Sequence, residues 1–217
     1  MTIHLTKAIE TLKTDLLHLA ALTEEQLERA LLSLEEGNIA LAEEVVEDDN
    51  ILDQKEVYIE EECLKILALY QPVAFDLRFV IAVLKINNDL ERIGDLAAGI
   101  ALRSIDLIKG NAVQAGFDFH EMSRQVVDML QKAIDALIKL NTAQAISVLQ
   151  ADSEVDRLHH QNMKRVVESL LNNPTKAQST VNYLVISRNL ERIADQTTNI
   201  AEDIVYLVDG RIIRHDR

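Results

Sequence analysis

Cysteine, proline and glycine are scarce in this chain of 217 residues, which has one Cys, two Pro and six Gly. The single Cys63 excludes an internal disulfide and fits a reducing compartment. With few helix breakers and many Ala, Leu, Glu, Ile and Lys residues, the composition is typical of long helices. The sequence therefore predicts an all-α protein, and sheet is not expected.

Long apolar runs are also missing, and positive charge is in short supply. No stretch is long enough to cross a bilayer, and Met1 to Thr14 lacks the apolar core of a signal peptide. We therefore expect a cytoplasmic protein that meets membranes only through partners. The net charge of -14 argues against nucleic acid, whose phosphates are bound by Lys and Arg, and it suits a cationic partner.

An internal duplication organises the chain. The segment Leu90-Glu91-Arg92-Ile93-Gly94-Asp95 returns 100 positions later as Leu190-Glu191-Arg192-Ile193-Ala194-Asp195. Further upstream, Asp49, Leu52 and Asp53 correspond to Asp152, Val155 and Asp156 at an offset of 103 positions. We predict two tandem three-helix bundles, over residues 1–112 and 113–217, joined by the linker-like segment 111–118.

Apolar periodicity and capping residues place six helices. Thr23 with Gln26 resembles a capping box that would divide the first helix near Leu22, but we favour a continuous helix. Asn38 is a candidate N-cap, and Asp118 with Glu121 is another. The expected helices span approximately residues 5–37, 38–69, 75–109, 118–140, 141–172 and 175–208.

Acidic residues four apart on these helices form the candidate site. Asp53 lies 19 residues before Pro72 and Glu91 lies 19 after it, while Asp49 and Asp95 lie 23 on either side. The two acidic pairs are therefore level in an antiparallel hairpin, and the second half repeats the arrangement about Pro174. Four carboxylates so close repel one another unless protons, Arg or a metal neutralise them. Oxygen ligands suit hard cations such as Mg²⁺, Ca²⁺, Mn²⁺ or ferric iron.

The predicted metal ligands are Asp49, Asp53, Glu91, Asp95, Asp152, Asp156, Glu191, Asp195 and Asn199. Gly99 and Leu102 stand in the first half where the second half has Asn199 and Glu202, so we expect the first site to be weaker or smaller. His159 follows Asp156 but has Glu56 as its first-half counterpart, and we do not count it as a ligand.

The alternative to metal binding is that the acidic pairs form a solvated helix face with ordinary surface ion pairs. A chain with this many acidic residues holds roughly half a dozen i,i+4 acidic pairs by chance, so one pair carries no information. The fourfold recurrence, the hairpin symmetry and the otherwise apolar rows around Asp49 and Asp152 favour metal binding. Arg92 and Arg192 point about 100° away from the neighbouring glutamates, and we expect them in structural salt bridges between helices or facing solvent.

The chain resembles the PhoU family of bacterial and archaeal regulators of phosphate uptake. The resemblance rests on Pro72-Val73-Ala74-Phe75-Asp76-Leu77-Arg78, the two Leu-Glu-Arg-Ile motifs and Asn199-Ile200-Ala201-Glu202. It implies a pair of three-helix bundles, a homodimer, and acidic E(D)xxxD motifs that hold iron clusters in some members. It further implies a regulator of the phosphate ABC transporter ATPase and of the linked sensor histidine kinase.

Carried over residue by residue, the family motif falls on the acidic pairs that the hairpin argument selects. The resemblance favours iron, while zinc, manganese, magnesium and calcium stay open. The sequence contains no nucleophile motif, no phosphate-binding glycine loop and no nucleotide motif, so we predict no catalytic residues. The alternatives are a carboxylate-bridged metalloenzyme, although no Glu-x-x-His motif is present, and a helical adaptor with another transporter or kinase as partner.

Overall fold

The chain folds into long helices. The computed structural model describes residues 3–110 and 119–213. Its elements are α1 (Ile3–Glu36), α2 (Ile39–Tyr70), α3 (Ala74–Lys109), α4 (His120–Lys139), α5 (Thr142–Asn172), the 3-10 helix η1 (Pro174–Lys176) and α6 (Ala177–Asp209). No strand occurs in either described range. The predicted all-α fold of two three-helix bundles is confirmed.

Local sequence explains where these helices begin and end. Gly37 adopts a φ of 65°, the left-handed conformation that ends many helices. The Asn38 side chain then accepts a hydrogen bond from the Leu41 amide (3.1 Å), and Asn141 accepts one from the Gln144 amide (3.2 Å). These N-caps are 103 positions apart, which is the offset already seen in the acidic pairs.

Two details of the helix prediction have different outcomes. The first helix is continuous, as favoured, and the Thr23–Gln26 pair lies buried inside α1 rather than at a break. The predicted cap at Asp118 and the predicted boundary between residues 112 and 113 lie outside the described residues. Within them, α4 begins at His120, near the expected start.

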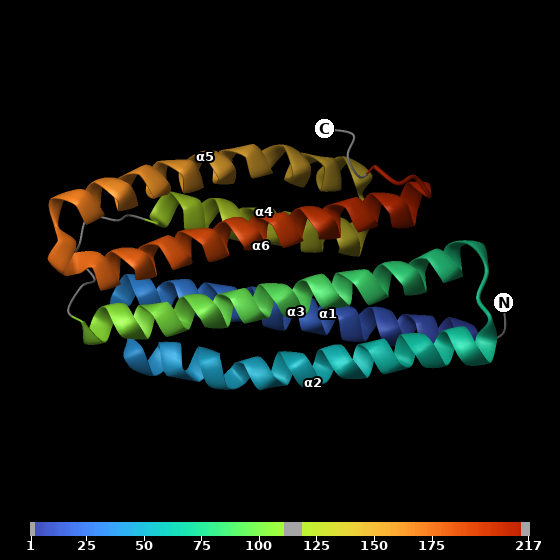
Figure 1. The fold of residues 1–217 in the computed structure, drawn as a ribbon. Helices are drawn as coiled ribbons and strands as arrows, with labels where there is room; N and C mark the ends of the chain where they lie inside the picture. Colours follow the sequence, from blue (N-terminus) through green and yellow to red (C-terminus); the bar gives the residue numbers. More distant parts are fainter. Residues whose placement is uncertain (1–2, 111–118, 214–217) are drawn as a thin grey trace.

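The two bundles lie against each other, with α3 and α6 side by side at the centre (Figure 1). In the described part of the chain, α2 contacts only α1 and α3, and α5 contacts only α4, α6 and η1. The acidic hairpins α2–α3 and α5–α6 therefore each have one helix at the interface and one on the outside.

Polar contacts fix the register of α3 against α6. Lys85 Nζ lies 2.8 Å from the carboxylate of Asp203, whose side chain is only 4% exposed. Asn199 Nδ2 donates to Asp89 Oδ1 at 3.5 Å. The residue numbers of each pair add to the same value, as they must along two antiparallel helices.

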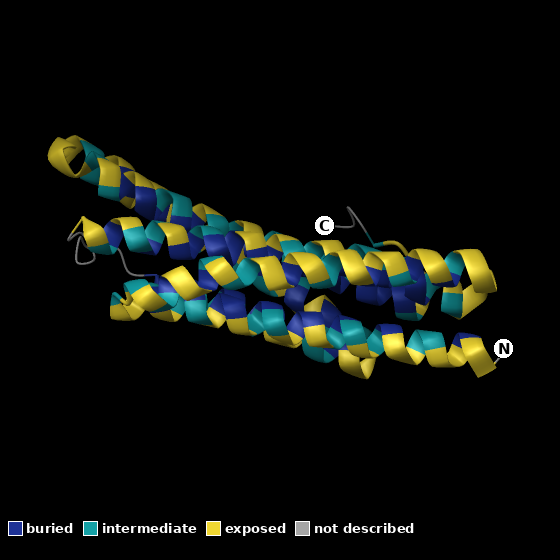
Figure 2. Ribbon diagram, turned by 90° about the horizontal axis from the view of Figure 1, so that it is seen from below, coloured by how far each residue is buried: buried dark blue, intermediate teal, exposed yellow. Residues whose placement is uncertain are grey.

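Apolar side chains fill the space between the helices. The buried residues form a continuous hydrophobic cluster that includes all six helices. Burial follows one face of each helix, with exposed residues on the outer face (Figure 2). None of the helices in the described ranges is long and apolar enough to span a membrane.

Candidate metal centre

Three carboxylates converge where α2 meets α3 in the first half. Asp49 and Asp53 come from α2 and Asp95 comes from α3, and one oxygen of each lies within 4.8 Å of the other two. Asp49 is half-buried, while Asp53 and Asp95 are exposed. We call these three residues the first-half cluster. The hairpin register that the distances from Pro72 predict brings these side chains together.

The donor set of this cluster fits a hard cation. Mg²⁺ and Ca²⁺ bind carboxylate oxygens at roughly 2.0–2.6 Å, so two oxygens on opposite sides of one ion are about 4–5 Å apart. The separations in the first-half cluster fall within that reach. All three donors are oxygens, with no thiolate or imidazole among them, which favours Mg²⁺, Ca²⁺, Mn²⁺ or ferric iron over a typical structural zinc site.

Crowding of like charge shows in the electrostatics around the cluster. Burial raises the pKa of Asp49, the Gln26 hydrogen bond lowers it, and the charges of Asp95 and Asp53 raise it further. Burial raises the pKa of Glu91 as well, and the neighbouring Asp95 adds to that shift. Glu91 thus belongs to the same electrostatic neighbourhood, although its carboxylate is not one of the three that converge.

Arg92 makes ion pairs with this neighbourhood within the described residues. Arg92 Nη1 lies 3.4 Å from Asp95 Oδ2, and its Nε lies 3.7 Å from Glu91 Oε2. Of the two expectations for Arg92, the solvent-facing one is confirmed, because the side chain is 55% exposed and pairs with acids of its own helix rather than bridging helices. An exposed pair of this kind contributes little, so the repulsion within the cluster is only weakly offset.

Two residues that the sequence reasoning missed support the cluster from behind. Gln26 of α1 donates from Nε2 to Asp49 Oδ1 at 2.9 Å. Gly94 of α3 allows a close approach of α2, because a Cβ there would lie 2.7 Å from Leu52 Cδ2 and 3.6 Å from Asp49 Oδ1. The sequence did contain a sign of the role of Gln26, because this polar residue lies in the apolar stripe of α1. Its spacing from Thr23 made it resemble part of a helix cap instead.

The second half presents its acids differently. Asp152 is buried, and Asp156, Glu191 and Asp195 are half-buried. Burial raises the pKa of Glu191, and Asp195 and Asp156 raise it further, so these acids are neighbours. Among the described residues, however, three acidic side chains converge within 4.8 Å only in the first-half cluster. The expectation of a weaker or smaller first metal site stays a prediction.

A groove runs beside the second-half acids. It has a volume of about 500 Å³, and Asp152, Asp156, Glu202 and Arg211 are among its lining residues. A guanidinium thus shares this groove with three carboxylates. His159, which we did not count as a ligand, forms a hydrogen bond through Nδ1 with Ser187 Oγ at 3.0 Å.

Asn199, which we predicted as a metal ligand, lies at the contact between α3 and α6. Its amide nitrogen bonds Asp89 across the α3–α6 contact. The matching first-half position, Gly99, lies at the same contact, where a Cβ would be 2.8 Å from Asn189 Nδ2. The difference between Gly99 and Asn199 therefore has a packing explanation that does not involve a metal.

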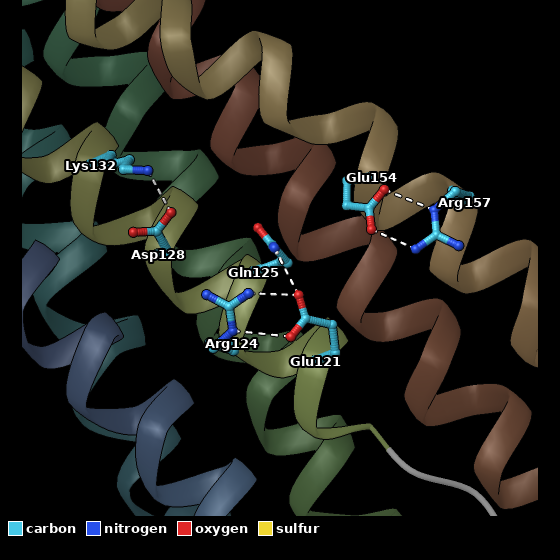
Figure 3. A network of polar contacts seen from close by, with 7 residues as sticks. All are labelled: Glu121, Arg124, Gln125, Asp128, Lys132, Glu154 and Arg157. Carbon is cyan, nitrogen blue, oxygen red and sulfur yellow. Dashed lines mark hydrogen bonds and ion pairs between the residues drawn. The ribbon is translucent and has the colours of Figure 1, made fainter.

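Other acidic residues of the chain do form ordinary surface ion pairs. On α4 and α5, Glu121, Asp128 and Glu154 each pair with a cation three or four residues further along the same helix (Figure 3). Hydrogen bonds from Arg124 and Gln125 lower the pKa of Glu121 to about 2. The pKa values of the ion-paired surface acids Glu121 and Glu154 are thus lowered, whereas those of Asp49, Glu91 and Glu191 are raised.

Comparison with known proteins agrees with this architecture. A model of the PhoU domain matches residues 16–104 and again residues 119–204. The chain belongs to the PhoU family. It is 37% identical over 208 residues to the phosphate-specific transport system accessory protein PhoU homolog of Pseudomonas aeruginosa, covering 95% of this chain and 86% of that relative.

Solved PhoU structures also match over nearly the whole chain. The crystal structure of PhoU from Pseudomonas aeruginosa superposes with a TM-score of 0.91 at 36% identity, covering 95% of this chain and 99% of that one. The phosphate transport system regulatory protein PhoU from Streptococcus pneumoniae gives a TM-score of 0.87 at 30% identity, covering 96% and 98%. The two domain matches correspond to the two helical bundles, so the duplication in the sequence is a duplication of the PhoU domain.

Proposed function

We propose that this PhoU-family chain is a non-enzymatic accessory protein of phosphate uptake. The observation that carries the proposal is its family membership, because the relative from Pseudomonas aeruginosa is named as an accessory protein of the phosphate-specific transport system. The partners would be the ATPase of the phosphate ABC transporter and the linked sensor histidine kinase. A homodimer and a cytoplasmic location remain predictions from the resemblance and the composition.

We further propose that the chain binds a hard metal cation at its paired carboxylates, with the first-half cluster as the better-formed site. The convergence of Asp49, Asp53 and Asp95 within 4.8 Å supports this proposal. The cation would neutralise repelling charges and change the electrostatic surface presented by the α2–α3 hairpin. Iron is the cation favoured by the family resemblance, and manganese, magnesium, calcium and zinc are to be tested beside it.

Elemental analysis of untagged protein tests the metal proposal. The test variant carries Asp49→Asn, Asp53→Asn and Asp95→Asn. Its matched control carries Glu121→Gln, Asp128→Asn and Glu154→Gln, which remove the same charge from ion-paired acids of α4 and α5. We expect metal to be lost only from the test variant. Equal metal content in both variants would contradict a site at the first-half cluster.

Partner binding is measured separately with the same two variants. Purified transporter ATPase and the cytoplasmic part of the sensor kinase are each immobilised, and binding of the chain is followed with and without a chelator. Binding that a chelator weakens in the unmodified protein and in the control variant, but not in the test variant, would support a metal-dependent contact. Failure to bind either partner under all conditions would refute the accessory role.

A further inference from the structure

Gln26 ties three helices together at the first-half cluster. It belongs to α1, is 3% exposed, and donates from Nε2 to Asp49 Oδ1 of α2 at 2.9 Å. The same amide nitrogen lies 3.4 Å from the carbonyl oxygen of Gly94 on α3. Gln26 is therefore a fully covered polar side chain that is aimed at the carboxylates from the core side.

The carbonyl oxygen of the Gln26 side chain destabilises the folded state. Gln26 Oε1 is buried and has no hydrogen-bond partner within the described part of the chain. An unsatisfied buried acceptor destabilises the folded state, and such a group in a native protein calls for an explanation other than stability. An apolar side chain of similar size would fill the same space without this penalty.

The duplication supplies that apolar side chain as an internal comparison. α1 ends at Glu36 and α4 at Lys139, and the N-caps Asn38 and Asn141 follow at the same offset of 103 positions. At this offset the counterpart of Gln26 is Met129, which is fully buried. The second half thus keeps the acidic pairs but has no amide at this position, and no three acids converge among its described residues.

Repulsion explains why an amide matters here. Asp49 faces the charges of Asp53 and Asp95, which push its carboxylate away from the cluster. A hydrogen bond from a buried donor opposes that movement and holds one oxygen of Asp49 in place. Hydrogen-bonded partners of metal-binding side chains typically change metal affinity by about 10–100-fold.

We infer that Gln26 is a positioning residue of the first-half cluster, which orients Asp49 for an oxygen-preferring cation and makes this half the tighter of the two sites. The inference rests on the proposed metal binding. It assigns the difference in affinity between the two halves to a residue of α1, because the acids at the matching positions are of the same type in both halves.

Manganese affinity tests the inference, because Mn²⁺ accepts oxygen ligands and its free fraction is measured directly by electron paramagnetic resonance. The background protein has Asp152→Asn, Asp156→Asn, Glu191→Gln and Asp195→Asn, so that only the first half can bind. Into this background we introduce Gln26→Met, which copies the residue at the equivalent position of the second half. We expect the Kd for Mn²⁺ to rise about 10-fold or more.

Thr23→Val is the matched control. Thr23 is also buried in α1, and its hydroxyl donates to the carbonyl oxygens of Leu19 and Leu90 rather than to an acid. Its counterpart at the same offset is Val126, so this variant also copies the second half. A purely structural role for polar residues of α1 predicts changes in melting temperature for both variants and no change in the Kd for either.

Each outcome separates the inference from the proposed function. Mn²⁺ binding that is equally tight with Gln26 and with Met at this position would overturn the positioning role and leave the metal site intact. A background protein that binds no Mn²⁺ would remove the first-half site, and the inference with it. If Gln26→Met does not fold, as judged by circular dichroism, Gln26→Ala provides the same comparison with a shorter side chain.

Discussion

Asp95→Asn is expected to stabilise the metal-free protein. One carboxylate oxygen of Asp95 lies within 4.8 Å of an oxygen of Asp49 and of an oxygen of Asp53. Two unit charges at that distance repel by about 0.9 kcal/mol in the dielectric of water, which suits these partly exposed groups. Replacing Asp95 removes two such repulsions, and the exposed Arg92 pair that is lost offsets less than about 1 kcal/mol.

The net gain in the free energy of unfolding is about 1 kcal/mol at low ionic strength. For a chain of this size that corresponds to a rise in melting temperature of about 2–4 °C. The gain should shrink as salt is added, because the repulsion is screened over about 8–10 Å at physiological ionic strength. With saturating Mn²⁺ the order reverses, since the unmodified protein gains the free energy of metal binding and the variant does not.

Asp195→Asn is the control, because no three acids converge around it among the described residues. Thermal unfolding of chelator-treated protein at several salt concentrations measures both variants. If Asp95→Asn lowers the melting temperature of the metal-free protein, or raises it no more than Asp195→Asn does, the argument from charge crowding is wrong.

Two further predictions concern titration. The pKa values of Glu91 and Glu191 are raised above 4.5, chiefly by burial, so the folded state binds more protons than the unfolded state just above that pH. These two groups should therefore make the free energy of unfolding of the metal-free protein fall as pH rises above 4.5, and Glu91→Gln with Glu191→Gln should remove that contribution in urea titrations. Burial raises the pKa of the Cys63 thiol to about 12. We accordingly expect no alkylation by iodoacetamide at about pH 8 until urea unfolds the protein, and rapid labelling of the folded chain would contradict this.

The helices and the hairpin register were predictable because they depend on local sequence. Apolar stripes set the helices, and asparagine caps fixed where α2 and α5 begin. Pro72 marks the turn between α2 and α3, so residues at equal distances before and after it lie level with each other in the hairpin. That simple geometry brought Asp49, Asp53 and Asp95 together from residues up to 46 positions apart.

The rest of the site depends on helices that the hairpin argument does not include. Gln26 reaches the cluster from α1, and its spacing from Thr23 resembled a cap because both patterns use the same residue types. Asn199 faces Asp89 because the two bundles pack through α3 and α6, and a repeat comparison within one chain cannot show which helices meet.

The position of the first-half cluster also limits what a bound cation can do. Its acids come from α2 and α3, and its supporting amide comes from α1, so every contributor belongs to one bundle. Two contacts that set the register between the bundles, Lys85 with Asp203 and Asn199 with Asp89, lie elsewhere along α3 and α6, while Asn189 donates to the Leu96 carbonyl oxygen beside Asp95 at 3.4 Å. A cation in the cluster would therefore act directly on the first bundle, which it would brace while reducing its surface charge. We accordingly expect metal to regulate a partner through the surface of the α2–α3 hairpin rather than by separating the two halves.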